Sequence, residues 1–100
     1  MKHSIKVSGN QATVLLKDKI YVNDASQLRD DLLEIMDQGV TDLRLDLSEL
    51  SYIDSSGLGT LVTINKRTKE KKGRLVLTGV QGLPLDLINR TRLNNVFTVE

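Results

Sequence analysis

The chain has 100 residues, of which 39% are hydrophobic, 27% charged and 3% aromatic, and its 14 basic and 13 acidic residues leave a net charge of +1. These values predict one small domain over residues 1–100 with an aliphatic core, and they give no general attraction to nucleic acid or anionic lipid. The absence of cysteine excludes disulfides, thiolate metal sites and cysteine nucleophiles. No apolar run reaches the roughly 18 to 20 residues that span a bilayer, and no signal-peptide segment follows the first residues. We therefore expect a cytoplasmic protein without membrane insertion.

The first forty residues have the pattern of two strands and a helix. Ile5 and Val7 alternate with polar neighbours, and residues 12–16 form a more apolar run after the turn-forming pair Gly9-Asn10, which predicts an antiparallel hairpin. An amphipathic helix should follow, because apolar residues then recur at spacings of three and four. These residues are Ala25, Leu28, Leu32, Ile35 and Met36.

The ends of this helix carry their own signals. Asn23 or Asp24 can cap its start, since a short oxygen-bearing side chain accepts from the unpaired amides of the first turn. Gly39 can end it in a left-handed conformation.

Strands and helices alternate through the rest of the chain. Residues 40–47 alternate apolar and polar side chains as a strand does, and a helix is expected over about residues 56–72. Residues 74–78 read as another strand. A last short helix is expected from Leu85, Leu87, Ile88 and Leu93, ending in Val96-Phe97. This order predicts an α/β domain with a small, mixed, mostly parallel sheet of four strands, an antiparallel N-terminal strand, and helices packed against the sheet.

The second half of the helix over residues 56–72 is strongly basic. A basic run permits a nucleic-acid interpretation, but lysines late in a helix also complement the helix dipole and usually form a solvated end. With so few aromatic residues for base stacking, we expect no direct contact with nucleic acid. The basic residues are Lys66, Arg67, Lys69, Lys71 and Lys72.

The stretch that carries chemistry joins the strand to this helix. Asp54, Ser55 and Ser56 are all side chains that favour a helix N-cap. The hydroxyls of the two serines lie at the positive end of the helix dipole, where an added phosphate would be favourable. Either serine is therefore a candidate modification site, and Asp54 either caps the helix or orients a hydroxyl.

Two glycines follow in the same stretch, Gly57 and Gly59, and they serve either close packing or the approach of a partner. They lack the third glycine of a dinucleotide-binding fingerprint, and the chain has neither a Gly-x-Ser-x-Gly elbow nor a Gly-Lys-Ser/Thr loop. His3 is the single histidine and lies close to the terminus, so neither a Ser-His pair nor a metal site is expected. We therefore expect no catalytic residue, no cofactor and no metal, and we do not expect an enzyme.

Residues 46–59, Asp-Leu-Ser-Glu-Leu-Ser-Tyr-Ile-Asp-Ser-Ser-Gly-Leu-Gly, resemble the signature of the anti-sigma factor antagonists, the bacterial branch of the STAS domains. The similarity continues through residues 60–62 and 74–77 and more weakly into residues 85–97. It implies a STAS-like fold and a partner that is both an anti-sigma factor and a serine-protein kinase. The unphosphorylated protein would bind this partner and release a sigma factor, and a phosphatase would reactivate the phosphorylated form.

The resemblance also assigns residues. The serine directly after the aspartate of the motif is the phosphorylated one in this family, which points to Ser55, with Ser56 as the rival. The expected partner-binding residues are Asp54, Ser55, Ser56, Gly57, Leu58, Gly59 and Tyr21.

One position departs from the family pattern. Members usually carry an acid before the first helix, close to the phosphorylated serine, and aligning on residues 25–28 puts Tyr21 at that position. The missing acid supports an alternative function, a STAS scaffold or accessory subunit of a signalling complex or transporter that docks without being phosphorylated.

Overall fold

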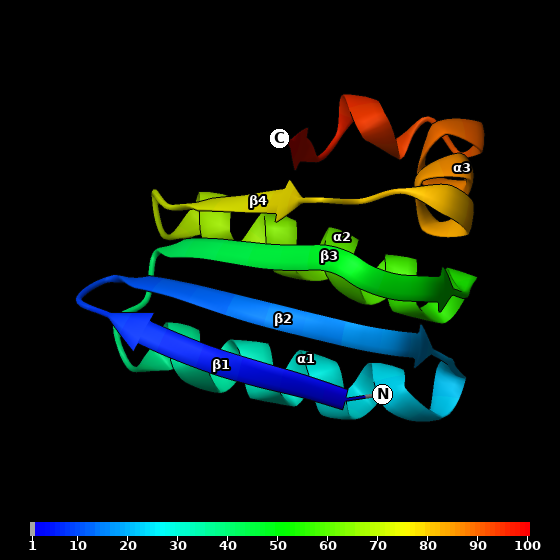
Figure 1. Ribbon diagram of the computed structural model, residues 1–100. Helices are drawn as coiled ribbons and strands as arrows, with labels where there is room; N and C mark the ends of the chain where they lie inside the picture. The colour runs from blue at the N-terminus through cyan, green and yellow to red at the C-terminus, as the bar shows by residue number, and fades with distance from the viewer. Residues whose placement is uncertain (1) are drawn as a thin grey trace.

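One five-stranded sheet forms the centre of the molecule in the computed structural model, which describes residues 2–100 (Figure 1). The strands lie in the order β1-β2-β3-β4-β5; β1 is antiparallel to β2, and the other pairs are parallel. The strands are β1 (Lys2–Ser8), β2 (Gln11–Ile20), β3 (Asp42–Ile53), β4 (Arg74–Thr78) and β5 (Thr98–Val99). The helices are α1 (Val22–Asp37), α2 (Ser55–Glu70) and α3 (Gly82–Arg90), followed by a short 3-10 helix at Leu93–Asn95.

The predicted α/β class with a mixed, mostly parallel sheet is confirmed, with five strands in place of four. The additional strand, β5, has only two residues and pairs with β4. So short a strand shows no alternation in the sequence, because it is defined by the neighbour it pairs with and not by its own pattern.

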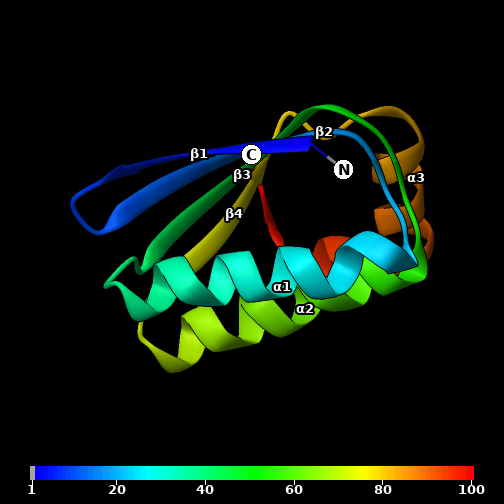
Figure 2. The same cartoon turned by 90° about the horizontal axis from the view of Figure 1, so that it is seen from below.

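Both long helices lie side by side on one face of the sheet (Figure 2). Alternate residues are buried in β2 from Ala12 to Leu16 and in β3 from Leu43 to Leu47, as the alternation of side chains in a strand requires. Beyond these residues the pairing of β2 with β3 is irregular, and the buried positions are Ile20, Leu50 and Ile53. The helix stripe over Leu28, Leu32, Ile35 and Met36 completes the aliphatic core between the two layers. No helix in the described part of the chain is long and apolar enough to cross a membrane.

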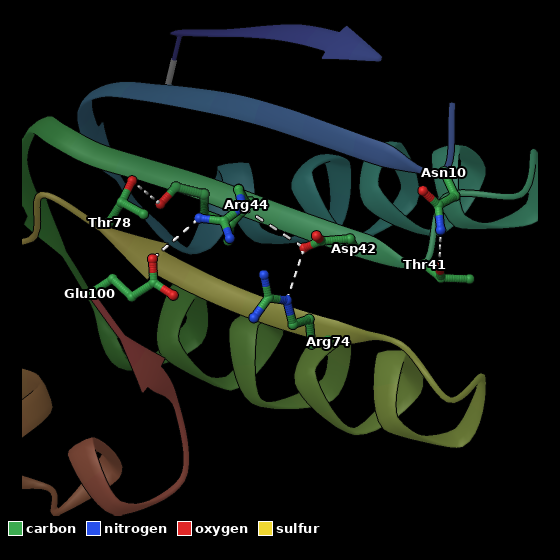
Figure 3. A network of polar contacts seen from close by, with 8 residues as sticks. Asn10, Thr41, Asp42, Arg44, Arg74, Thr78 and Glu100 are labelled. Atoms are coloured by element: carbon green, nitrogen blue, oxygen red, sulfur yellow. Dashed lines mark hydrogen bonds and ion pairs between the residues drawn. The ribbon is translucent and has the colours of Figure 1, made fainter. Parts of the chain in front are cut away.

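The opposite face of the sheet carries polar and charged side chains (Figure 3). Asp42 pairs with Arg74 at 3.3 Å and, more loosely, with Arg44 at 4.0 Å, and Arg44 pairs with Glu100 at 3.3 Å. The Glu100 backbone N–H also donates to the carbonyl of Leu77 at 2.9 Å. The last residue is thereby tied to β3 and β4.

The predicted hairpin of β1 and β2 is present, and Gly9 turns the chain with a φ of +61°. Gly39, with a φ of +106°, follows the end of α1 as expected. The expected cap of α1 at Asn23 or Asp24 is wrong, because β2 continues to Ile20 and the helix begins at once at Val22.

Candidate functional site

The corner between β3 and α2 lies at the carboxyl edge of the parallel strands. The backbone N–H of Asp54 donates to the carbonyl of Ile20, the last residue of β2, at 3.1 Å. The two strand-to-helix junctions, β2 to α1 and β3 to α2, are therefore neighbours at one end of the sheet (Figure 1). Open α/β sheets commonly bind their ligands just outside the carboxyl ends of the strands.

Asp54 caps helix α2. Its backbone is extended, with φ −93° and ψ 179°, and its Oδ1 accepts a hydrogen bond from the Gly57 N–H at 2.9 Å. Its carbonyl accepts the first intrahelical bond, from Leu58, at 3.0 Å. Of the two roles that the sequence left open for Asp54, the structure has the cap, and the helix starts at Ser55 instead of the expected Ser56.

The two serines differ in exposure. Ser55 is the first residue of α2 and is exposed, whereas Ser56 is half-buried. Neither hydroxyl makes a hydrogen bond with any of residues 2–100. Because Asp54 satisfies the cap, the hydroxyl of Ser55 is left at the surface, beside the positive end of the helix dipole.

The two glycines of the corner have different surroundings. A Cβ on Gly57 would lie 2.6 Å from Cγ1 of Ile53 and 2.9 Å from Cγ2 of Ile20, closer than side chains tolerate, so this glycine lets α2 approach both strand ends. A Cβ on Gly59 would meet nothing within 4 Å, and the residue is exposed. The fold explains Gly57 and gives no reason for Gly59.

Tyr21 forms an aromatic pair with Tyr52 next to the corner. The ring centroids are 5.5 Å apart at an interplanar angle of 42°, yet Tyr21 remains 46% exposed and Tyr52 37% exposed. Tyr21 directly follows Ile20, whose carbonyl binds the Asp54 N–H. The structure therefore brings Tyr21 to the edge that carries Ser55, as the alignment predicted.

Not all of the predicted partner-binding residues are surface residues. Tyr21, Ser55 and Gly59 are exposed, and Asp54 and Ser56 are partly buried. The other two, Gly57 and Leu58, are buried, so any contribution they make to a partner surface comes from shaping it.

A cavity of about 370 Å³ separates the corner from helix α3. Its corner side includes Tyr52, Ser55 and Leu58, and its α3 side includes Leu83, Leu87 and Arg90. This α3 side was missed in the sequence analysis. It follows from topology, because β3 and β4 are parallel and adjacent, so the helix after β4 begins at the same edge as the helix after β3.

One ion pair lies on the α3 side of the cavity. Asp86 and Arg90, one helical turn apart, approach to 3.0 Å. Both side chains are largely exposed, so water screens the pair.

The family model of the STAS domain matches residues 3–100. The anti-sigma-B factor antagonist of Bacillus subtilis (strain 168) is 33% identical over 95 residues, covering 95% of this chain and 86% of its own length.

Solved structures share the fold at lower identity. A Thermotoga maritima protein assigned as an anti-sigma factor antagonist superposes with a TM-score of 0.90 at 18% identity, covering 97% of this chain and 84% of that one. The anti-sigma factor antagonist SpoIIAA in its unphosphorylated form gives a TM-score of 0.80 at 17% identity, covering 99% of this chain and 87% of that one. The chain therefore belongs to the STAS domain family, in the group of the anti-sigma factor antagonists.

Proposed function

We propose that this protein is a regulatory binding protein that antagonises an anti-sigma factor. In its unphosphorylated form it binds an anti-sigma factor that is also a serine-protein kinase, and the bound sigma factor is released. The identity shared with the Bacillus subtilis anti-sigma-B factor antagonist supports this partner class. A phosphatase reverses the modification, and the exchange takes place in the cytoplasm.

The observation that carries the proposal is the exposed hydroxyl of Ser55 at the start of α2, which has no hydrogen-bond partner among residues 2–100. The kinase transfers the γ-phosphoryl group of ATP to Ser55 Oγ, the hydroxyl proton is lost, and ADP leaves. Ser55 is preferred over Ser56 because it is the more exposed of the two.

Phosphorylation switches binding off through charge. A phosphoserine adds about −1.5 to −2 charges at pH 7. When a partner covers the corner, the phosphate must lose its water beside the carboxylate of Asp54, and this dehydration costs binding free energy. A loss of about 2.8 kcal/mol at the interface weakens binding a hundredfold.

The experiment is a kinase assay with site mapping. The protein and its Ser55→Ala and Ser56→Ala variants are incubated with ATP and the anti-sigma factor kinase from the same genome, and mass spectrometry locates the phosphate. We expect modification of the wild type and of Ser56→Ala, and none of Ser55→Ala. Modification that persists in Ser55→Ala and disappears in Ser56→Ala moves the assignment to Ser56.

A second function is favoured by one observation, the aromatic pair of Tyr21 and Tyr52 where the family pattern has an acid. In this alternative the protein is a STAS scaffold or accessory subunit of a signalling complex or transporter, and the corner docks without being phosphorylated. Genes for a serine kinase and a sigma factor beside this one argue for the antagonist, and transporter genes argue for the scaffold. A protein that binds its partner equally well before and after treatment with kinase and ATP is the scaffold.

A further inference from the structure

The cavity beside the corner is lined by both the proposed acceptor serine and a cationic side chain. Ser55 lines one side of it and Arg90, from helix α3, lines the other. Arg90 is the only cationic side chain among the described residues that line this cavity, and the charged groups facing it are the carboxylates of Asp54 and Asp86. The unmodified cavity therefore carries a net negative charge.

We propose that the guanidinium of Arg90 binds the phosphate of phosphorylated Ser55 within the same molecule. The ion pair between Arg90 and Asp86 breaks when this contact forms. The proposal rests on the assignment of Ser55 as the acceptor. Helix α3 thereby becomes part of the switch, which the motif around Ser55 does not indicate.

Charge and hydrogen-bonding capacity both favour this exchange. A guanidinium binds phosphate oxygens through two parallel N–H donors, and a phosphate dianion offers more negative charge than one carboxylate. The bond that must be broken is an exposed pair within one helix, at 3.0 Å with side chains 76% and 51% exposed, which is the weak kind of ion pair.

Without Arg90, the phosphate would lie beside two carboxylates. Asp54 cannot turn away without giving up the Gly57 N–H that it binds at 2.9 Å, so its charge stays at the corner. Asp86 is released from Arg90 and can turn to water, because its side chain is 51% exposed. Among the described residues that line the cavity, Arg90 is therefore the cation that can offset the added charge.

The test measures the second pKa of the phosphate itself. Phosphoserine is introduced at position 55 by translation with an expanded genetic code, so no kinase is needed, and the phosphorus NMR signal is followed as a function of pH. A nearby cation stabilises the dianion and lowers this pKa from its usual value of about 6. We expect Arg90→Gln to raise it by about 0.5 units or more, and Asp86→Asn, which frees Arg90, to lower it.

A matched variant controls for net charge. Arg67→Gln removes the same charge from the exposed last turn of α2, outside the cavity, and should leave the pKa within about 0.1 units of the parent. Equal shifts in Arg90→Gln and Arg67→Gln, or no shift in either, overturn the proposal. The proposed function is tested by a different experiment, the kinase assay. A kinase that does not modify Ser55 would contradict the proposed function without changing the pKa measured here.

Discussion

The two strand-to-helix junctions at the carboxyl edge of the sheet begin their helices in different ways. At the β3–α2 junction, Asp54 caps the helix with its own carboxylate. At the β2–α1 junction, Tyr21 occupies the cap position and offers no side-chain bond, and Asp24 reaches back from the third helical position to the Tyr21 N–H at 2.9 Å. Each arrangement leaves one side chain exposed: the Ser55 hydroxyl at α2 and the Tyr21 ring at α1.

The two junctions nevertheless form one surface. The Asp54 N–H binds the Ile20 carbonyl, the rings of Tyr21 and Tyr52 are paired, and Gly57 lies against both strand ends. A substitution can therefore act on one junction alone or on the surface that both junctions share, and measurements of stability and partner binding can tell the two cases apart.

The largest effect is expected for a charge at Ser55. Ser55→Asp should weaken binding of the anti-sigma factor by a hundredfold or more, about 2.8 kcal/mol, because a carboxylate at the docked corner must be dehydrated. The fold should remain intact, since a carboxylate suits a helix N-terminus. Calorimetric titration measures the binding, and thermal melts measure the fold.

Ser55→Ala is the matched control for that experiment. It should bind as the wild type does and change stability by no more than about 0.5 kcal/mol, because Asp54 and not Ser55 is the cap. If Ser55→Asp binds as tightly as Ser55→Ala, the corner is not the switch.

Gly57 should be the most sensitive structural position of the shared surface. Gly57→Ala places a methyl group against Ile53 and Ile20 at distances below 3 Å, so it should cost about 1 to 3 kcal/mol by overpacking. Gly59→Ala has open space around it and should stabilise the helix by about 0.5 to 1 kcal/mol. Chemical denaturation of both variants checks this difference in sign, and equal effects would contradict it.

Removal of the α2 cap should have an intermediate effect confined to one junction. Asp54→Ala loses the acceptor for the Gly57 N–H and should cost about 1 kcal/mol, whereas Asp54→Asn keeps an oxygen there and should cost less. Tyr21→Ala removes no cap bond, because the side chain of Tyr21 makes none. Tyr21→Ala does remove the ring contact with Tyr52, so Tyr52→Ala, which removes the same contact, is its control. A Tyr21→Ala variant that loses about 1 kcal/mol more than Tyr52→Ala would show that the two junctions are not built differently.

Local pattern was sufficient to predict most of the fold. The turn at Gly9, the apolar stripe of α1 and the corner after Ile53 were all found, because each depends on residues close together in sequence. The two-residue strand β5 was not found, since it depends on pairing with β4.

The candidate site was predictable in part for the same reason. The Asp-Ser-Ser-Gly stretch identifies the corner, but its residues could not decide which oxygen caps the helix, because both serines and the aspartate are competent acceptors. The contribution of Arg90 and Asp86 comes from a segment some thirty residues further along the chain, brought there by the parallel pairing of β3 and β4. Packing distance, and not residue type, separates Gly57 from Gly59.

The smallest expected effect tests the α1 junction through pH. The hydrogen bond from the Tyr21 backbone holds the pKa of Asp24 below its ordinary value. A carboxyl whose pKa is lowered by folding stabilises the protein above its unfolded pKa of about 3.9, and this contribution is lost as the pH falls through the folded value. Asp24→Asn keeps an acceptor but no charge, so it should be slightly less stable than the wild type at pH 6 and equally stable at low pH. Solvent screening keeps the difference at pH 6 small.

Urea denaturation of wild type and Asp24→Asn across the acid range measures this difference. Glu34→Gln is the matched control, because Glu34 lies exposed on the same helix and its carboxylate has no hydrogen bond or ion pair within residues 2–100. The control should follow the wild type at every pH. A stability gap between wild type and Asp24→Asn that stays constant down to the lowest pH would mean that the bond to Tyr21 depends on the shape of the side chain and not on its charge, and the two junctions would then differ only in the position of the capping residue.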